Sequence, residues 1–255
     1  MSRGRLSQVA ALCCALLGLA GANAFGEGAL VKVNDIVLRA DGDFQPHELP
    51  RRSFAPISFH GYFDIAAKGG GKPVALQEAT IDFDRDGRLS AGGLATCSPA
   101  SVANASPTEA RRACAASIVG SGRIEALVDL GDQATLASSP LTLFNGPPQE
   151  GHPTVVLHAR FEGPAAETLA IVVPIERRRG GFRYRAHLSL PPLAAGLGAV
   201  TRVEVAIGRR FRRGAKQRSY VSARCSDGVL RTHGRFSFVD GTIVDGSVEK
   251  ACASR

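Results

Sequence analysis

The sequence predicts an all-β protein, an antiparallel β-sandwich of the jelly-roll kind with one short helix and two disulfides. Short runs rich in Val, Ile, Phe and Thr alternate apolar with polar residues, which is the pattern of half-buried strands. Clusters of Gly and Pro separate these runs and provide turn signals, as in an all-β sandwich. An even number of cysteines in the mature chain favours disulfides.

Each expected strand is a run of this alternating kind, and several neighbouring runs should form hairpins. We expect turns at Arg179-Gly180-Gly181 and at Asp240-Gly241, since glycine readily adopts the positive φ that tight hairpin turns need. The expected strands lie within residues 29–39, 54–67, 76–84, 122–130, 139–146, 153–163, 167–190, 200–211, 219–225 and 233–252.

One segment, residues 106–120, departs from the alternating pattern and predicts a short helix. Ser106 suits the N-cap and Pro107 the first helical position, while Glu109 can complete a capping box with Ser106. The alanines of the segment favour a helix, which we expect to end before Gly120.

The first 24 residues have the three parts of a secretory signal peptide. Arg3 and Arg5 give a positive start, residues 9–20 are apolar, and Ala22-Asn23-Ala24 has the small-x-small pattern of a cleavage site. A membrane anchor is the alternative, but the apolar run is shorter than the roughly 20 residues that span a bilayer. We expect a secreted or extracellular protein, associated with the cell envelope or free, and no transmembrane segment after signal cleavage.

The rest of the chain is long enough for one large β domain or two small ones. Residues 25–53 are interpreted as an N-terminal arm or extended segment. Residues 54–255 are interpreted as a single β-sandwich domain.

Four cysteines follow the signal segment: Cys97, Cys114, Cys225 and Cys252. In an exported chain they are expected to form disulfides. Four cysteines allow three pairings, and we favour the two local pairs, Cys97–Cys114 and Cys225–Cys252. A structural zinc site is the alternative, but the sequence has no C-x-x-C pair and no histidine cluster near these residues.

The motif D-x-D-x-D-G at residues 82–87 matches the opening of an EF-hand calcium loop. Such a loop needs a bidentate Glu at its twelfth position and helices on both sides. Position twelve here is Gly93, and the approach to the motif alternates like a strand. Weak calcium binding by Asp82, Asp84 and Asp86 outside an EF-hand is the alternative, and we expect no metal.

The same motif suits a hairpin turn at residues 84–87. Asp is favoured at the first position of a turn, and the glycine can adopt a positive φ. With alternation along the strand, Ile81 and Phe83 would face the core, while Asp82 and Asp84 would face water.

Charge is unevenly distributed, because residues 25–150 carry a net charge of −4 and residues 151–255 carry +10. Two arginine-rich tracts, 176–185 and 208–218, fall at expected hairpin ends. Such arginines can bind anionic cell-wall polymers, acidic polysaccharide or lipid headgroups. The alternative is a solvated surface that prevents strand edges from aggregating. The candidate ligand-binding residues are Arg177, Arg178, Arg179, Arg183, Arg209, Arg210, Arg212 and Arg213.

Other function classes have less support in the sequence. Few aromatic residues accompany the arginines, which disfavours nucleic acid, and the lack of Trp disfavours neutral sugars. No H-E-x-x-H or G-x-S-x-G motif is present, so we expect no catalytic residue and no cofactor. A triad assembled from distant residues would leave no such motif. The histidines that could take part are His47, His60, His152, His158, His187 and His233.

Several short motifs resemble those of exported β-rich proteins of unknown function from high-GC Gram-positive (actinobacterial) bacteria. They are GGLATC (92–97), ARRACAASIVGSG (110–122), LFNG (143–146), IGRRF (207–211), SYVSARC (219–225) and FSFVDG (236–241), with Cys252 after them. The resemblance implies export, a framework of four cysteines and a β-rich body, and it assigns no catalytic or binding residue.

Taken together, these patterns predict a non-enzymatic binding module for an anionic ligand, secreted or associated with the envelope. A secreted hydrolase with a site assembled from distant residues is one alternative. A structural or adhesion component of the envelope is the other.

Overall fold

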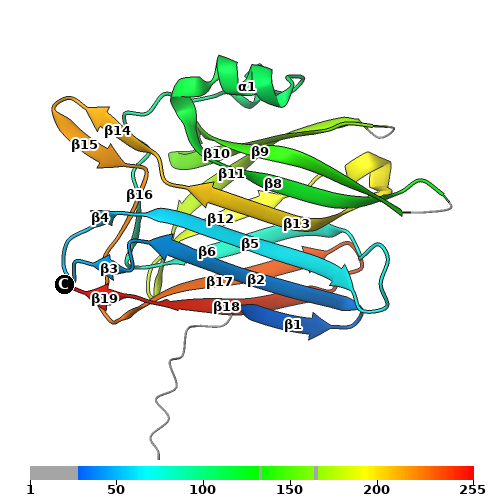
Figure 1. Ribbon diagram of the computed structural model, residues 1–255, viewed down its shortest axis with the longest axis horizontal. Coiled ribbons are helices and arrows are strands. Elements are labelled where there is room, and N and C mark those ends of the chain that lie inside the picture. The colour runs from blue at the N-terminus through cyan, green and yellow to red at the C-terminus, as the bar shows by residue number, and fades with distance from the viewer. Residues whose placement is uncertain (1–27, 132–133, 164–165) are drawn as a thin grey trace, which may run out of the picture.

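The computed structural model describes residues 28–131, 134–163 and 166–255, and the predicted signal peptide, residues 1–24, lies outside them. The described chain is mostly β-structure (Figure 1). The predicted all-β class is therefore confirmed, and each predicted strand segment contains at least one strand.

Within the described residues, the largest sheet has twelve strands in the order β1-β2-β5-β13-β8-β9-β10-β11-β12-β6-β17-β18. Every pair of neighbours is antiparallel. The strands are β1 (Ala29–Val33), β2 (Ile36–Gln45), β5 (Ser58–Ala67), β13 (Gly198–Ile207), β8 (Ile118–Asp129), β9 (Ala134–Gln149), β10 (His152–Phe161), β11 (Glu167–Arg177), β12 (Phe182–Ser189), β6 (Leu76–Asp84), β17 (Val229–Phe238) and β18 (Ile243–Ala251).

The large sheet curls until its two ends face each other. Phe63 of β5 meets Phe236 of β17 with ring centroids 5.2 Å apart, although these strands stand far apart in the sheet order. At the edges, a Cβ at Gly246 of β18 would lie 3.2 Å from Val31 Cγ2 of β1. The edge strands β1 and β18 lie against one another, with little room for a side chain at residue 246 (Figure 1).

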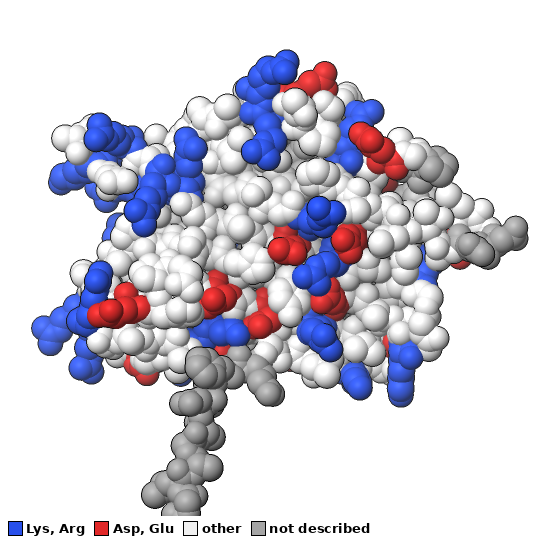
Figure 2. Space-filling model, viewed as in Figure 1, with Lys and Arg blue, Asp and Glu red and all other residues white. Residues whose placement is uncertain are grey.

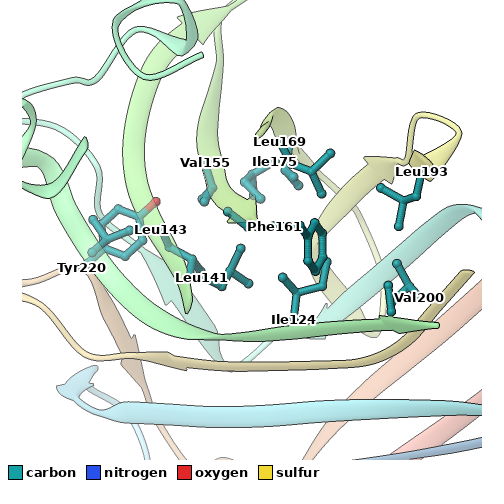
Figure 3. Close-up of a cluster of buried hydrophobic side chains, with 14 of the residues drawn as sticks. Ile124, Leu141, Leu143, Val155, Phe161, Leu169, Ile175, Leu193, Val200 and Tyr220 are labelled. Carbon is teal, nitrogen blue, oxygen red and sulfur yellow. The ribbon is translucent and has the colours of Figure 1, made fainter. Parts of the chain in front are cut away.

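The core fills the space that the curled sheet encloses (Figure 3). Burial of each large apolar side chain contributes about 1.5–3 kcal/mol to the free energy of unfolding. The largest cluster of buried side chains in the core includes Ile124, Leu141, Leu143, Val155, Phe161, Leu169, Ile175, Leu193, Val200 and Tyr220.

Smaller elements surround one end of the large sheet. β14 (Arg210–Arg213) pairs with β15 (Lys216–Ser219), and β19 (Ala253–Ser254) pairs in parallel with β3 (Glu48–Leu49). A three-stranded sheet has the order β4 (Ala55–Pro56), β16 (Val221–Ala223), β7 (Gly87–Leu89). Three short 3₁₀ helices complete the elements of the described residues: Pro99–Ser101, Ala115–Ser117 and Leu193–Gly196.

The predicted helix is present as α1 (Pro107–Ala113), which begins where the capping residues place it. The Ser106 backbone N–H donates to Glu109 Oε2 at 2.8 Å, and the Glu109 N–H donates to Ser106 Oγ at 3.3 Å. The capping box is thus complete, and Cys114 forms the C-cap. No helix in the described part of the chain has the length and apolar character needed to cross a bilayer.

Both predicted disulfides are confirmed, Cys97–Cys114 and Cys225–Cys252. The first joins the end of α1 to the loop before it. The second joins the segment after β16 to the segment after β18. Cross-links of this loop size stabilise a folded chain by about 3 kcal/mol each.

Two further predictions concern the hairpin turns and the N-terminal segment. The hairpin turns are confirmed, because β11 pairs with β12 and β17 with β18, and Gly180 and Gly241 have φ of 95° and 83°. Residues 25–53 are interpreted from the sequence as an N-terminal arm or extended segment, and the described part of that segment contributes β1 and β2 to the large sheet. The alternating run at 29–39 forms these strands, and β2 continues to Gln45 despite the polar residues there.

Candidate functional site

The acidic motif forms a turn, but the hairpin predicted there is wrong. β6 ends at Asp84 and β7 begins at Gly87, as the turn prediction requires. However, β7 pairs with β16 rather than with β6, and Gly87 is not among the glycines with positive φ. The turn therefore carries the chain from the large sheet into the small one.

The expectation that Asp82 and Asp84 face water is also wrong. Both side chains are buried, as is Asp86. Arg185 donates two hydrogen bonds to Asp82, from Nε to Oδ1 at 2.8 Å and from Nη2 to Oδ2 at 2.6 Å. Ile81 and Phe83 do pack against the core on the other side, so this part of β6 is covered on both faces.

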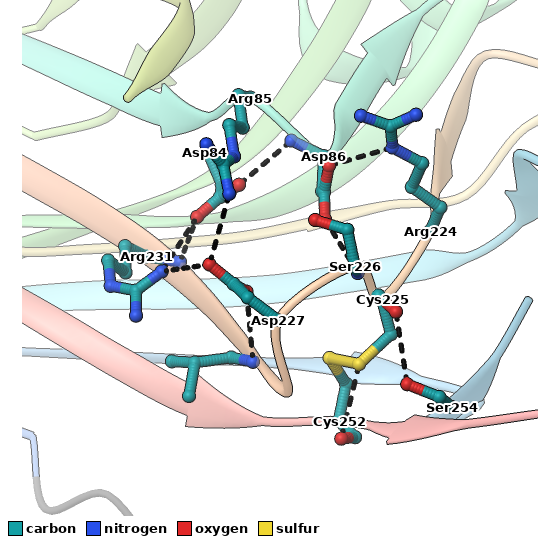
Figure 4. The surroundings of a disulfide bond; sticks show 11 residues. Asp84, Arg85, Asp86, Arg224, Cys225, Ser226, Asp227, Arg231, Cys252 and Ser254 are labelled. Carbon is teal, nitrogen blue, oxygen red and sulfur yellow. Dashed lines mark hydrogen bonds and ion pairs between the residues drawn. A yellow bond between two sulfur atoms is a disulfide. The ribbon is translucent and has the colours of Figure 1, made fainter. Parts of the chain in front are cut away.

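The other two carboxylates accept hydrogen bonds from fixed protein donors (Figure 4). Asp84 accepts from the backbone N–H of Asp86 at 2.8 Å and of Arg231 at 2.9 Å. Asp86 accepts from Arg224 Nε at 2.7 Å and from the Ser226 N–H at 2.8 Å. Each of these carboxylates therefore has a protein donor on both of its oxygens.

The pKa directions agree with this structural role. Burial raises the pKa of Asp84 above its ordinary value. Burial also acts to raise the pKa of Asp86, but the hydrogen bonds from Ser226 and Arg224 outweigh it and lower that pKa. Within the described residues, no group of three His, Cys, Asp or Glu side chains has the arrangement of a metal site.

The first arginine tract lies at the hairpin between β11 and β12. Arg177, Arg178 and Arg179 are exposed at its tip. Arg183 differs from them, because its Nε donates to the Arg85 carbonyl oxygen at 2.7 Å. The Arg85 N–H in turn donates to the Gly181 carbonyl oxygen at 3.0 Å, which fastens the hairpin to the acidic turn.

The second tract forms the β14–β15 hairpin, which projects from one end of the molecule (Figure 1). Arg209, Arg210, Arg212 and Arg213 are exposed, and basic side chains gather over this hairpin in the space-filling view (Figure 2). No hydrogen bond or ion pair between described residues joins the two hairpins. Each is instead connected to the β4–β16–β7 sheet, the first through the acidic turn and the second through Tyr220.

The structure also assembles an arginine cluster that the sequence analysis missed. Three guanidinium groups surround the Phe54 ring, with their Cζ atoms 5.5 Å (Arg88), 5.1 Å (Arg183) and 5.3 Å (Arg224) from its centroid. Only Arg183 was a predicted site residue. We call these three arginines and Phe54 the Phe54 cluster.

Strand register explains how the cluster forms. Ser222 of β16 stands opposite Pro56 of β4 and Arg88 of β7. Phe54 lies two residues before Pro56 and Arg224 lies two residues after Ser222, so both share the face of Arg88. Arg183 reaches this face from β12. The only sequence signal was the alternation in residues 219–225, which predicts that Arg224 lies at the end of a strand. It does not predict which residues lie next to Arg224.

A separate feature is an open groove of about 350 Å³ at the end of β2, β5 and β13. Ser58, His60 and Asp43 lie along it. His60 Nε2 is 3.0 Å from Glu204 Oε1, and no hydrogen bond joins Ser58 to His60 among the described residues. The remaining lining residues are Phe44, Gln45, Phe59, Ala206, Ile207 and Gly208.

Comparison of the chain with protein-family models, with curated proteins and with solved structures gave no match. The geometry of the molecule is therefore the basis for any functional assignment.

Proposed function

We propose that the protein is an exported, non-enzymatic binding module, a β-sandwich of the jelly-roll kind that holds an anionic ligand with arginines at one end. The ligand would be an anionic cell-wall polymer or a membrane surface with anionic headgroups. The exported proteins of high-GC Gram-positive bacteria that its motifs resemble would be its relatives.

A single observation carries the proposal. The eight predicted arginines have no carboxylate within 4.0 Å among the described residues, and they lie on two hairpins at the same end of the molecule. Seven of the eight are exposed, and the eighth, Arg183, belongs to the Phe54 cluster. Guanidinium groups bind phosphate and carboxylate oxygens in pairs, so unpaired arginines at one end favour an anionic partner there.

Retention on a polyanion matrix tests the proposal. Replacing Arg209, Arg210, Arg212 and Arg213 with Ser should lower the salt concentration at which the protein elutes, because exposed charges are screened by salt. The matched control replaces four exposed arginines elsewhere and removes the same charge: Arg39, Arg111, Arg112 and Arg123. Equal losses for both variants would show that net charge alone explains retention, and the proposal would fail.

The groove favours a hydrolase as the second candidate. Ser58 and His60 are two residues apart on β5, so they share a face, and Asp43 stands opposite His60 in the register. A nucleophile, a base and carboxylates are therefore near one another. Turnover of simple ester substrates that disappears in both Ser58→Ala and His60→Gln would support this candidate.

Retention on cell walls at any salt concentration would instead support a structural or adhesion component of the envelope.

A further inference from the structure

We propose that the Phe54 cluster is a binding site for a dianionic phosphate group such as a phosphomonoester. The inference rests on the proposed function and deepens it, because it names the ligand class and places it in one site rather than on the hairpin surface.

The charge of the cluster is not balanced within the described residues. Arg224 has a partner, since its Nε is 2.7 Å from Asp86 Oδ1. Arg88 and Arg183 have no carboxylate within 4.0 Å in the described part of the chain. The cluster therefore holds an excess of two positive charges around one ring. Like charges gathered around one ring repel each other, and a bound dianion would offset this repulsion.

The donors of the cluster are held in place for such a ligand. Arg224 and Arg183 each use Nε in a hydrogen bond to a fixed acceptor, Asp86 Oδ1 and the Arg85 carbonyl oxygen respectively. Their terminal Nη groups have no protein partner among the described residues. All three guanidinium groups also contact the Phe54 ring, so the side chains lose little freedom when a ligand binds.

Phosphate fits this arrangement better than a carboxylate does. One carboxylate offers two oxygens in a plane and a single charge, which suits one bidentate arginine. A phosphomonoester offers three terminal oxygens around a tetrahedral centre and close to two charges, which suits three guanidinium groups around one ring and their excess of two charges. The exposed side of Arg88 leaves the cluster open to solvent on that side.

Isothermal titration calorimetry at about pH 8 tests the site, with inorganic phosphate as the first probe and acetate as the control anion. We expect saturable 1:1 binding of phosphate and none of acetate. Arg88→Gln should weaken phosphate binding about tenfold, and this exposed residue has no hydrogen-bonded side chain to lose among the described residues. Arg183→Lys keeps the charge and should also weaken binding, since lysine lacks the paired donors.

The outcomes separate this inference from the proposed function. The R209S/R210S/R212S/R213S variant should bind phosphate normally while losing retention on a polyanion. No saturable binding, or binding unchanged in both Arg88→Gln and Arg183→Lys, would overturn the site even if polyanion retention holds. Glucose 6-phosphate and vesicles containing phosphatidic acid then distinguish the source of the phosphate group. Binding of glucose 6-phosphate alone indicates a sugar phosphate, and binding of the vesicles indicates a lipid headgroup.

Discussion

Asp86 and Arg224 form an ion pair in which the Asp86 side chain is completely buried while the Arg224 side chain is 29% exposed. The pair connects two parts of the chain that lie 138 residues apart in sequence. Asp86 belongs to the motif that suggests calcium, and Arg224 belongs to the Phe54 cluster. The acidic turn therefore orients an arginine of that cluster.

The first prediction concerns this pair. Asp86→Asn should lower the free energy of unfolding by about 3 kcal/mol, because it leaves Arg224 without its counter-charge in a largely buried position. Urea unfolding at neutral pH measures the loss as a lower midpoint with an unchanged slope.

Asp245→Asn is the matched control for the buried pair. Asp245 is 53% exposed and contacts Arg235 and His233, which are also partly exposed. Surface pairs of this kind contribute about 0–1 kcal/mol. Equal losses in the two variants would contradict a special structural role for Asp86.

The second prediction concerns Tyr220, whose side chain is 1% exposed. Its hydroxyl has no hydrogen-bond partner among the described residues, and burial raises its pKa. Tyr220→Phe should therefore leave stability unchanged or raise it slightly, since no bond is lost and a buried polar group is removed. Tyr220→Ala should cost about 3–5 kcal/mol because it opens a cavity in the core. A large loss in Tyr220→Phe would reveal a partner for the hydroxyl.

The third prediction separates the two disulfides. Replacing Cys225 and Cys252 with Ser should weaken phosphate binding as well as stability, because Arg224 precedes Cys225 directly and the Cys225 N–H donates to Pro50 at 3.0 Å. The Cys97–Cys114 bond holds α1 on β9 and β10, away from the Phe54 cluster. Removing that bond should lower stability by about 2–5 kcal/mol without changing the phosphate dissociation constant. Calorimetry and urea unfolding of both variants check the distinction.

Local features of this fold could be predicted from sequence. Ser106, Pro107 and Glu109 act within one helical turn, so their spacing alone specifies the capping box. Gly180 and Gly241 mark hairpin turns for a similar reason, because a positive φ is a property of one residue. The local cysteine pairs also follow from short separations along the chain.

Features that depend on distant strands could not be predicted. Asp82 is buried because Arg185 of β12 covers it. No pattern in the sequence predicts that β12 pairs with β6. The Phe54 cluster draws on four separate segments, so its arginines look like scattered surface charges in the sequence. The exposed arginine tracts were visible because their residues are consecutive.

The last prediction concerns pH and His158, whose ring is completely buried. Its Nε2 is 3.0 Å from the Ala105 carbonyl oxygen, between β10 and the segment that leads into α1. Burial is the main cause that lowers the pKa of His158, and the charge of Arg160 acts in the same direction. The folded protein therefore holds this histidine neutral at a pH where the unfolded chain begins to take up a proton.

The sign follows from proton linkage. The unfolded chain binds more protons once the pH falls below the ordinary histidine pKa of 6.5, so the free energy of unfolding decreases there. Between pH 7 and pH 5 the loss through this residue is at most about 2 kcal/mol. Carboxylates with a lowered pKa, such as Asp86, lose their contribution only near and below the ordinary value of 3.8, so they hardly change this window.

Urea unfolding at pH 7, 6 and 5 measures the effect against His158→Gln, whose amide can donate to Ala105 without titrating. The variant should be less stable than the natural protein at pH 7, and the difference should shrink or reverse by pH 5. Glu109→Gln provides a second comparison, because hydrogen bonds from Ser106 lower the pKa of that carboxyl and it stays ionised throughout this range. Parallel pH profiles for the natural protein and His158→Gln would show that another group controls stability in this window.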